Sequence, residues 1–348
     1  MIAAAGTGGH IYPGIAIAEV FEKNGFSIFW LGTSYGMENN LLDLKKIKLF
    51  HLSIEGIRGK GLWAWSKLPI ILIHSFFQAL DAIRKTKPVA VILMGGYISM
   101  PVALAAKFLK IKVIIHEQNA IPGFTNKTLS KIATKTFCAF PNSLKNATVI
   151  GNPIRAKINN VPKPNTRFIN RKGPLRVLVI GGSLGASFFN KNLPNLFKLM
   201  SKVKRISVIH QSGVKNYKPL NKNYGKVDFP LKVVKFVYDI EKKYDWADLV
   251  IARSGALTVS ELSKAGVASI LVPYPFAVDN HQYFNARILE ERNAAIIIDQ
   301  SEGVDKLFEV LKEFDRKKCR LMALNAKHNL EQEPSNEIFK FCNLINEK

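Results

Sequence analysis

The chain has 348 residues, of which 47% are hydrophobic and 22% charged, and its formal net charge is +24. This composition excludes a disordered or fibrous protein, and the length predicts two folded domains of roughly 150 to 200 residues each. The charge predicts attraction to a polyanion: nucleic acid, anionic lipid headgroups or a phosphorylated substrate. Biased amino-acid usage on solvated faces explains the same excess, so the charge alone does not decide between these classes.

Short apolar runs alternate with helical stretches, which is the pattern of a parallel α/β protein. Buried strands are expected first at residues 2–5, 28–31, 89–94, 113–116, 136–139 and 148–150. A polar, proline-bearing segment from Arg155 to Pro174 then predicts a domain boundary. A second series of strands is expected at 175–180, 207–210, 233–237, 249–252, 269–272 and 295–298. We therefore expect two Rossmann-like domains, each with a doubly wound parallel sheet.

Cysteines and apolar runs indicate an intracellular protein that does not span a membrane. Cys138, Cys319 and Cys342 are scattered without metal-ligand spacing, which favours a reducing compartment. The first residues show no basic region or cleavage site of a secretory signal. The longest apolar stretch, Leu68 to Phe77, is far shorter than the roughly 20 residues of a spanning helix.

Two glycine-rich turns, at residues 6–10 (GTGGH) and 181–186 (GGSLGA), each follow an apolar run and open a helical stretch. Such turns let backbone N–H groups approach a phosphate at a helix N-terminus. The first turn does not fit a dinucleotide fingerprint, because Ile11 stands where the third glycine belongs and no acidic residue ends the second strand. Two anion cradles therefore predict a pair of substrates bound between two lobes, without a nicotinamide or flavin.

A third motif, ADLVIARSGALTVSEL at 247–262, predicts a strand, a Ser-Gly turn and a helix. Backbone N–H groups at Gly255 to Leu257 can bind a diphosphate, and the Glu261 carboxylate can accept two ribose hydroxyls. Taken alone, the motif is also compatible with a helix capped by Ser254 and a solvated Glu261.

An aromatic and apolar segment at 62–77 lies between basic residues, among them Arg58, Lys60, Lys67 and Arg84. Such a segment is typical of an interfacial membrane patch, and equally of a buried helix with solvated ends. The candidate membrane-contact residues are Trp63, Trp65, Ile70, Ile73, Phe76 and Phe77.

Seven stretches together carry a resemblance to a known family: GTGGHIYPGIAIAE (6–19), GGYIS (95–99), HEQNAIPGFTNK (116–127), GNPIR (151–155), GGSLGA (181–186), HQSG (210–213) and ADLVIARSGALTVSEL (247–262). In order and spacing they resemble the family 28 glycosyltransferases of bacterial peptidoglycan synthesis, which convert lipid I to lipid II. This resemblance implies the GT-B fold, two Rossmann-like domains facing across a cleft. It implies an N-terminal domain, 1–158, for lipid I and the membrane, and a C-terminal domain, 159–348, for UDP-GlcNAc. The last helix is expected to pack back on the N-terminal domain.

The resemblance also implies ligand contacts. Glu261 would hold the ribose, the backbone near Val237 the uracil, and the amides of Asn119 and Gln282 the GlcNAc hydroxyls. The implied UDP-GlcNAc residues are Thr7, Gly8, Gly9, Asn119, Arg155, Ser183, Val237, Ala256, Leu257, Thr258, Val259, Ser260, Glu261 and Gln282. The acceptor diphosphate would lie at Gly6, Thr7, Gly8 and Gly9.

The implied reaction is an inverting displacement in which the C4 hydroxyl of lipid-linked MurNAc attacks the anomeric carbon and UDP leaves. His10 is the first candidate for the general base because an ordinary imidazole titrates near neutral pH, although a lone histidine at a helix start is more often structural. Glu117 is the second candidate, and it also suits a role in orienting its neighbours. No Asp-x-Asp or His-Glu-x-x-His motif is present, so neither a metal nor another cofactor is expected.

The expected partners are UDP-GlcNAc, lipid I, an anionic membrane surface and other cell-wall synthesis proteins, at the cytoplasmic face of the bacterial inner membrane. Two alternatives within the fold remain, another UDP-sugar glycolipid glycosyltransferase and a UDP-GlcNAc epimerase. A nucleic-acid-binding protein is the alternative from another class, but it leaves both glycine turns unexplained. We therefore expect no nucleic-acid partner.

Overall fold

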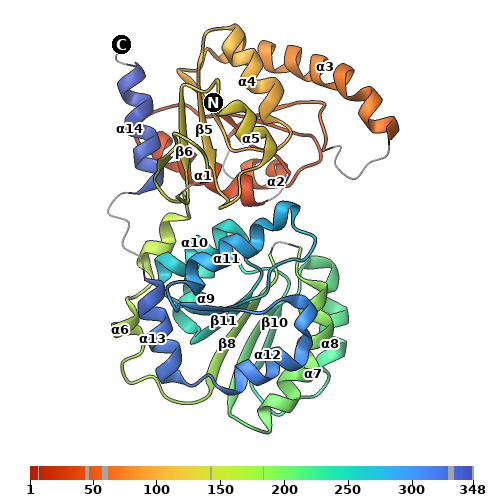
Figure 1. The fold of residues 1–348 in the computed structure, drawn as a ribbon, viewed down its shortest axis with the longest axis vertical. Helices are drawn as coiled ribbons and strands as arrows, with labels where there is room; N and C mark the ends of the chain where they lie inside the picture. The colour runs from red at the N-terminus through yellow and green to blue at the C-terminus, as the bar shows by residue number, and fades with distance from the viewer. Residues whose placement is uncertain are drawn as a thin grey trace. The chain divides into compact units, whose positions relative to one another are not determined.

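The computed structural model describes residues 1–6, 8–43, 47–56, 62–141, 143–182, 184–327 and 333–346, with side chains omitted at 43 and 62–65. These residues form two compact units, drawn in Figure 1. The first unit runs from Met1 to Arg155 and also includes the C-terminal helix α14 (Pro334–Asn346). The second unit begins at Ala156 and continues through helix α13 (Arg316–Ala326).

The described strands of the first unit form one parallel sheet of seven, in the order β3-β2-β1-β4-β5-β6-β7. The strands are β1 (Ile2–Ala3), β2 (Phe29–Gly32), β3 (Lys48–His51), β4 (Ala90–Leu93), β5 (Lys112–Glu117), β6 (Lys135–Cys138) and β7 (Thr148–Val149). The other helices are α1 (Gly8–Lys23), α2 (Glu38–Asp43), α3 (Leu62–Thr86), α4 (Ser99–Phe108) and α5 (Phe124–Leu129). The strand order reverses between β1 and β4, which is where doubly wound sheets bind ligands.

Strand β1 and the residues after it show why helices cover both faces of this sheet. Ile2 and Ala4 are buried in one core with Phe21 of α1, whereas Ala3 and Ala5 are buried in another with Ala79 of α3. This alternation follows from the two-residue period of strand side chains. Helix α14 joins the first of these cores, where its Phe339 ring makes edge contacts with Phe21 and Phe26.

The second unit repeats the design with a parallel sheet of six described strands, in the order β10-β9-β8-β11-β12-β13. They are β8 (Leu175–Ile180), β9 (Ile206–Gln211), β10 (Leu231–Val234), β11 (Leu249–Ala252), β12 (Ala268–Leu271) and β13 (Ala295–Ile297). The remaining helices are η1 (Ala156–Asn160), α6 (Pro164–Arg167), α7 (Ser187–Ser201), η2 (Val214–Asn216), α8 (Tyr217–Tyr224), α9 (Ile240–Trp246), α10 (Ala256–Ala265), η3 (Val278–Asn280), α11 (His281–Glu290), η4 (Gln300–Glu302) and α12 (Gly303–Lys312). Two doubly wound parallel sheets confirm the predicted fold class.

Two predicted strands differ from the structure. Strand β3 was not predicted, because it is an edge strand whose four residues are exposed or half-buried and give no buried apolar run. Strand β10 ends at Val234, whereas the sequence pattern placed a strand at 233–237. The apolar residues after Val234 instead belong to the turn that carries Val237, which is buried without being in the sheet.

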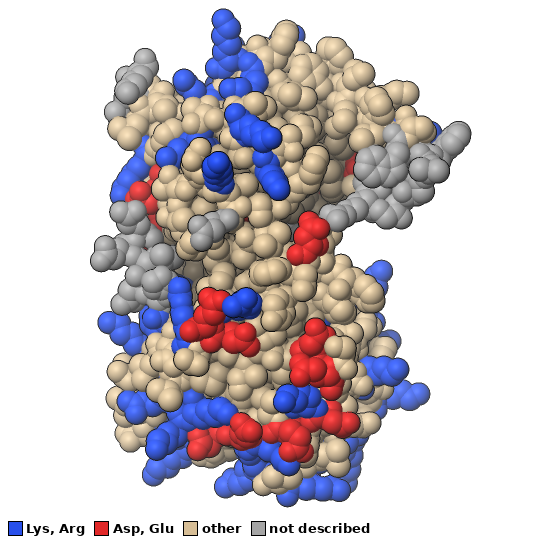
Figure 2. All heavy atoms as spheres, in the orientation of Figure 1, with Lys and Arg blue, Asp and Glu red and all other residues tan. Residues whose placement is uncertain are grey.

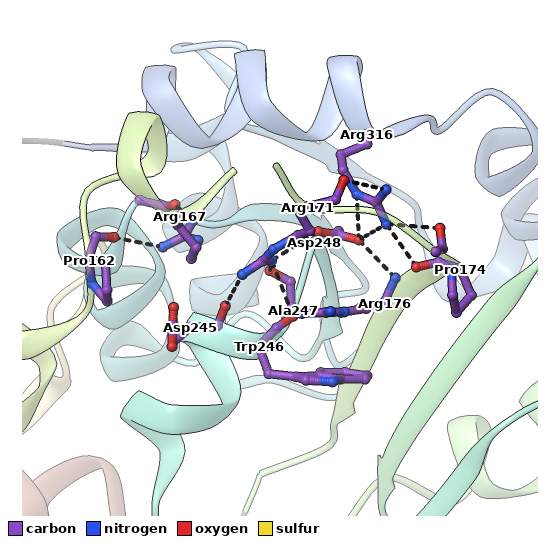
Figure 3. Close-up of polar contacts among 12 residues, drawn as sticks. Pro162, Arg167, Arg171, Pro174, Arg176, Asp245, Trp246, Ala247, Asp248 and Arg316 are labelled. Atoms are coloured by element: carbon purple, nitrogen blue, oxygen red, sulfur yellow. Dashed lines mark hydrogen bonds and ion pairs between the residues drawn. The ribbon is translucent and has the colours of Figure 1, made fainter. Parts of the chain in front are cut away.

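A buried ion cluster around Asp248 holds the start of the second unit, as Figure 3 shows. Arg171 donates to Asp248 Oδ1 at 2.9 Å, while Arg316 donates to Oδ2 from Nη2 at 3.1 Å and from Nε at 3.3 Å. The backbone N–H of Arg176 also donates to Oδ2, at 3.0 Å. Arg171 and Arg316 further donate to backbone carbonyls of 245–247 and 171–174. Asp248 precedes β11, so this cluster lies at the amino ends of the strands and stabilises the fold.

Candidate functional site

The first glycine turn joins the end of β1 to α1. Gly6 has a φ of +89°, and its N–H donates to Glu38 Oε2 at 3.3 Å. The Glu38 side chain is fully buried, and its Oε1 also accepts from the N–H and the hydroxyl of Thr33, both at 2.8 Å. A buried carboxylate therefore already holds one N–H of the predicted phosphate cradle. No motif pointed to Glu38, because the contact depends on the neighbouring positions of β1 and β2.

The rest of this turn begins helix α1. Gly8 and Gly9 are its first two residues, and the first turn contains no acidic side chain. N–H groups in the first turn of a helix have no acceptor within the helix, so they remain suited to an anion. Thr7, predicted to contact both diphosphates, lies outside the described residues.

The imidazole of His10 lies against the turn between β4 and α4. A Cβ built on Gly95 would be 3.4 Å from His10 Nε2, and one built on Gly96 would be 3.6 Å from His10 Cε1. Both glycines have positive φ angles, +94° and +78°, which other residues adopt only with strain. The structure thus brings the end of β1 and the end of β4 together around His10.

Glu117 ends β5 and is only 2% exposed. Its Oε1 accepts from Asn119 N at 2.9 Å and Asn119 Nδ2 at 3.3 Å, and its Oε2 from Gly123 N at 3.2 Å and Asn126 Nδ2 at 2.9 Å. Burial raises the pKa of Glu117, and these four donors oppose that shift by stabilising the charged form. The carboxylate therefore organises the loop between β5 and α5, including Asn119.

Two further residues, His116 and Arg155, belong to this part of the first unit. His116 is fully buried, with Nε2 at 2.9 Å from the Gly151 carbonyl, and burial lowers its pKa to about 4. Arg155 is half-buried, and its guanidinium carbon lies 5.2 Å from the ring centroid of Tyr12 on α1. A cation–π contact of this kind orients the guanidinium that the family resemblance places near the nucleotide.

The backbone of the second glycine turn lies directly against the backbone at Ser212 and Gly213, after β9. Gly182 and Gly185 have φ angles of +84° and +78°, and a Cβ on Gly185 would lie 2.0 Å from the Ser212 carbonyl oxygen. Gln211 joins this turn to the predicted uracil contact, because its Nε2 donates to the Gly182 carbonyl at 2.6 Å and its Oε1 accepts from Val237 N at 3.2 Å. Ser183 lies outside the described residues.

Helix α10 begins at the carboxyl end of β11, next to β8 in the sheet. Gly255 is its N-cap and no side chain caps it, so the first N–H groups of α10 are not held by a cap. Ala256 and Val259 are buried, while Leu257, Thr258 and Ser260 are half-buried. Ser254 Oγ is buried and has no hydrogen-bond partner among the described residues.

The two predicted sugar contacts on the second unit already have protein partners. Glu261 is buried, and the Tyr244 hydroxyl donates to its Oε2 at 3.2 Å. Gln282 Oε1 accepts from Tyr274 N at 3.0 Å. No sequence motif indicated Arg253. Its guanidinium donates to the Val272 and Pro273 carbonyls at 3.0 and 2.8 Å and fixes the loop after β12.

No group of three or more His, Cys, Asp or Glu side chains that could hold a metal ion occurs within the described ranges. Among the described residues, each unit thus has a glycine turn and a helix N-terminus at the carboxyl ends of its strands, and the first unit adds His10 and the amide of Asn119 there.

The predicted membrane patch lies on helix α3. Ile70, Ile73 and Phe77 are 71%, 59% and 59% exposed, whereas Phe76 is half-buried and its ring meets that of Phe108 on α4. Phe108 is itself 66% exposed, so the apolar surface extends to α4. The side chains of Trp63 and Trp65 lie outside the described set. None of the described helices is long and apolar enough to cross a membrane.

Comparison with known proteins identifies the family. The glycosyltransferase family 28 N-terminal domain matches residues 1–138, and the family 28 C-terminal domain matches residues 176–339. The chain belongs to glycosyltransferase family 28. The two matches together cover most of the chain, and the resemblance carried by the seven sequence stretches is confirmed.

Relatives of this family 28 chain include two transferases of one name. Proteins from Cupriavidus metallidurans and Dechloromonas aromatica are 39% and 38% identical to it, over 346 and 345 residues. The alignments cover 99% of this chain in both cases, and 97% and 98% of the relatives. Each is named UDP-N-acetylglucosamine--N-acetylmuramyl-(pentapeptide) pyrophosphoryl-undecaprenol N-acetylglucosamine transferase.

Solved structures give the same result. The crystal structure of Acinetobacter baumannii MurG has a TM-score of 0.83 and 35% sequence identity, covering 100% of this chain and 99% of the other. The UDP-GlcNAc 2-epimerase from Neisseria meningitidis, bound to UDP-GlcNAc, has a TM-score of 0.60 at 14% identity, over 99% and 98% of the two chains. This second likeness concerns the fold alone. The family 28 chain thus has the GT-B fold.

Proposed function

We propose that this family 28 glycosyltransferase transfers GlcNAc from UDP-GlcNAc to the C4 hydroxyl of MurNAc in undecaprenyl-pyrophosphoryl-MurNAc-pentapeptide (lipid I), giving lipid II. The observation that carries the proposal is the identity of 38 to 39% with transferases of that name over 99% of the chain. The chemistry of the described residues agrees with each part of this reaction.

The donor nucleotide binds the second unit, at the switch point between β8 and β11. The glycine turn after β8 and the uncapped N-terminus of α10 supply N–H groups for the diphosphate. Glu261 takes the ribose hydroxyls and the backbone at Val237 the uracil, with Gln211 holding that backbone in place. The half-buried residues Leu257, Thr258 and Ser260 line the approach to the nucleotide.

The chemical step is a single displacement with inversion. The C4 hydroxyl oxygen bonds to the anomeric carbon of GlcNAc, the bond from that carbon to the diphosphate oxygen breaks, and UDP leaves with the electron pair. The hydroxyl proton passes to His10, which is half-buried at the carboxyl edge of the first sheet. Glu117 acts as an orienting group, since four N–H donors surround its carboxylate.

The charge that develops on the leaving UDP needs stabilisation without a metal ion. The N–H groups and dipole of α10 supply part of it, and the guanidinium of Arg155 supplies the rest. In the first unit, the N–H groups at Gly8 and Gly9 face the acceptor diphosphate, while Glu38 fixes Gly6 behind them. We therefore expect transfer to proceed in the presence of a chelator.

The lipid tail of the acceptor requires contact with a membrane surface. Between Glu55 and Glu117 the chain has one acidic residue, Asp81, against nine Lys or Arg, and Asp81 is paired with Lys85. On the face drawn in Figure 2, basic side chains lie over both units, whereas the acidic ones gather mainly over the second. Ile70, Ile73 and Phe77 are exposed within this basic stretch of sequence and would bind the cytoplasmic leaflet of the inner membrane.

The transfer itself is tested with UDP-GlcNAc, a short-chain lipid I analogue and EDTA, with products identified by mass spectrometry. The proposal predicts an analogue heavier by one GlcNAc residue, together with free UDP. UDP binding without transfer would overturn the acceptor assignment, and conversion of the donor to its 2-epimer would identify an epimerase instead. UDP-glucose and UDP-galactose, tested in parallel, are expected to transfer much more slowly.

The membrane contact is tested by sedimentation with vesicles that contain anionic lipid. The triple substitution Ile70→Ser, Ile73→Ser and Phe77→Ser is expected to lower the bound fraction severalfold, because it removes exposed apolar area. A matched triple substitution of exposed apolar residues on the second unit, Leu199, Val203 and Leu321, is expected to leave binding unchanged. Equal binding by both triple variants would contradict the assignment of this surface.

A further inference from the structure

The amide side chain of Asn126 is buried, and its two polar atoms have unequal partners. Nδ2 donates to Glu117 Oε2 at 2.9 Å and to the His116 carbonyl at 3.3 Å. Oδ1 has no hydrogen-bond partner in the part of the chain that is described. The neighbours fix which atom is which, because a carboxylate and a carbonyl both require a donor. A buried acceptor without a donor is costly, so Oδ1 needs a partner that this state does not supply.

Gly95 separates Asn126 from the imidazole of His10. A Cβ built on Gly95 would lie 3.4 Å from His10 Nε2, 3.1 Å from Asn126 Nδ2 and 3.5 Å from Asn126 Oδ1. A Cβ on Gly96 would instead lie 3.6 and 3.7 Å from His10 Cε1 and Nδ1. The ring therefore lies along the Gly95–Gly96 turn with Nε2 at its Asn126 end. Because Gly95 has no side chain, the space next to both groups stays open.

We propose that Asn126 is the positioning residue for His10, with Oδ1 accepting a hydrogen bond from His10 Nε2–H, directly or through one water molecule. An amide oxygen can only accept, so this contact keeps the proton on Nε2. Nδ1 is then the atom that receives the proton of the attacking hydroxyl. Asn126 Nδ2 keeps its hydrogen bond to Glu117, so the amide of Asn126 links the buried carboxylate to the imidazolium that forms on His10. The kinetic part of this inference rests on the proposed function.

A pair of glycine substitutions tests the contact without changing either side chain. Gly95→Ala places a methyl group within 3.1 to 3.5 Å of both the amide and the imidazole, whereas the methyl of Gly96→Ala would only make ordinary contact with the ring. Both glycines have positive φ, so the two variants carry comparable backbone strain. We expect kcat to fall about 10- to 100-fold further in Gly95→Ala than in Gly96→Ala, with an unchanged KM for UDP-GlcNAc in both. Equal losses would overturn the inference.

A double substitution separates positioning from a structural role. Asn126→Leu is expected to lower kcat by about 10- to 100-fold in the parent, but by less than about twofold in a His10→Ala background. Losses that multiply would mean that Asn126 acts independently of His10, and would overturn the proposal. The glycine pair keeps the test decisive if Asn126→Leu fails to fold, since it leaves the side chains of Asn126, Glu117 and His10 chemically unchanged.

A spectroscopic test does not depend on turnover. In protein labelled with 15N-histidine, the His10 ring signals are assigned by their absence in His10→Ala. We expect an Nε2–H tautomer whose proton exchanges slowly, and faster exchange of that proton in Gly95→Ala. An Nδ1–H tautomer, or exchange that Gly95→Ala leaves unchanged, would overturn the contact. If the parent fails to transfer GlcNAc, the proposed function fails, while this signal still decides whether Asn126 holds His10.

Discussion

Replacing Asp248 by Asn removes the carboxylate that Arg171 and Arg316 share in the ion cluster drawn in Figure 3, while keeping the shape of the side chain. Asp248 is 0% exposed, and the side chains of Arg171 and Arg316 are 8% and 24% exposed. Breaking a buried ion pair by neutralising one partner typically costs about 3 to 5 kcal/mol, because the opposite charge stays buried. Here two guanidiniums lose their carboxylate, and the new amide nitrogen faces N–H donors.

We therefore expect Asp248→Asn to lower the unfolding free energy of the second unit by about 3 to 5 kcal/mol. For a unit of this size, each kcal/mol shifts the melting temperature by roughly 2 to 4 °C, so Tm should fall by about 10 °C. Calorimetry of the full chain measures this shift. We expect added UDP to raise the transition of the second unit, because the proposed donor site lies there. The first transition should not move.

Asp81→Asn is the matched control, because Asp81 pairs with Lys85 on the surface, where the two side chains are 61% and 64% exposed. Such a pair is worth less than about 1 kcal/mol. In addition, Arg316→Met should destabilise the parent more than it destabilises Asp248→Asn, since the cation has already lost its partner there. A change within about 1 kcal/mol for Asp248→Asn would refute this account of the cluster.

Three further predictions concern the glycine turns and a buried histidine. Gly185→Ala should raise the Kd for UDP, measured by calorimetry, at least about 10-fold, because its Cβ would overlap the Ser212 carbonyl. The control Gly303→Ala should leave this Kd unchanged, because Gly303 has a similar positive φ but open space around its Cβ position. Glu38→Gln should raise the KM for the lipid I analogue roughly 10-fold, because the hydrogen bonds from Gly6 N and Thr33 N to the carboxylate lose their charge. The KM for UDP-GlcNAc should not change, and Glu22→Gln, at an exposed position, should change neither KM. Burial lowers the pKa of His210 to about 3, below its unfolded value of about 6.5, so the unfolded state binds the proton first as pH falls. His210 should therefore lower the unfolding free energy of the second unit by about 1.4 kcal/mol per pH unit between pH 6.5 and about 3, and His210→Phe should reduce the slope by that amount in denaturant titrations at several pH values; an unchanged slope would contradict the assignment.

The sequence predicted the fold well because most strands of both sheets are buried on two faces and give continuous apolar runs. Strand β3 lies at an edge and shows no such run, so its four residues were not predicted. The same limit applies to helix α3: its composition indicated an apolar surface, but only packing shows that Phe77 faces outward while Phe76 meets Phe108.

The candidate site was predicted where it consists of local motifs and missed where it depends on contacts between strands. The glycine turns and the α10 motif are continuous in sequence and were found. Glu38 reaches Gly6 across 32 positions, and Arg253 reaches the Gln300 side chain across 47, so no spacing rule could suggest either contact. For Glu117, the residue was predicted, but its four donors, which favour an orienting role, required the geometry of the loop after β5.

In the proposed reaction, His10 in the first unit takes the acceptor proton while the second unit binds the donor. Its most direct test is one variant, His10→Ala, measured in two ways: the rate of GlcNAc transfer to the lipid I analogue and the Kd for UDP-GlcNAc. We expect transfer to fall about 10²- to 10⁴-fold and the Kd to stay within about twofold of the parent. Full transfer activity in His10→Ala would contradict the assignment of the base, and a weakened Kd would contradict the division of roles between the two units.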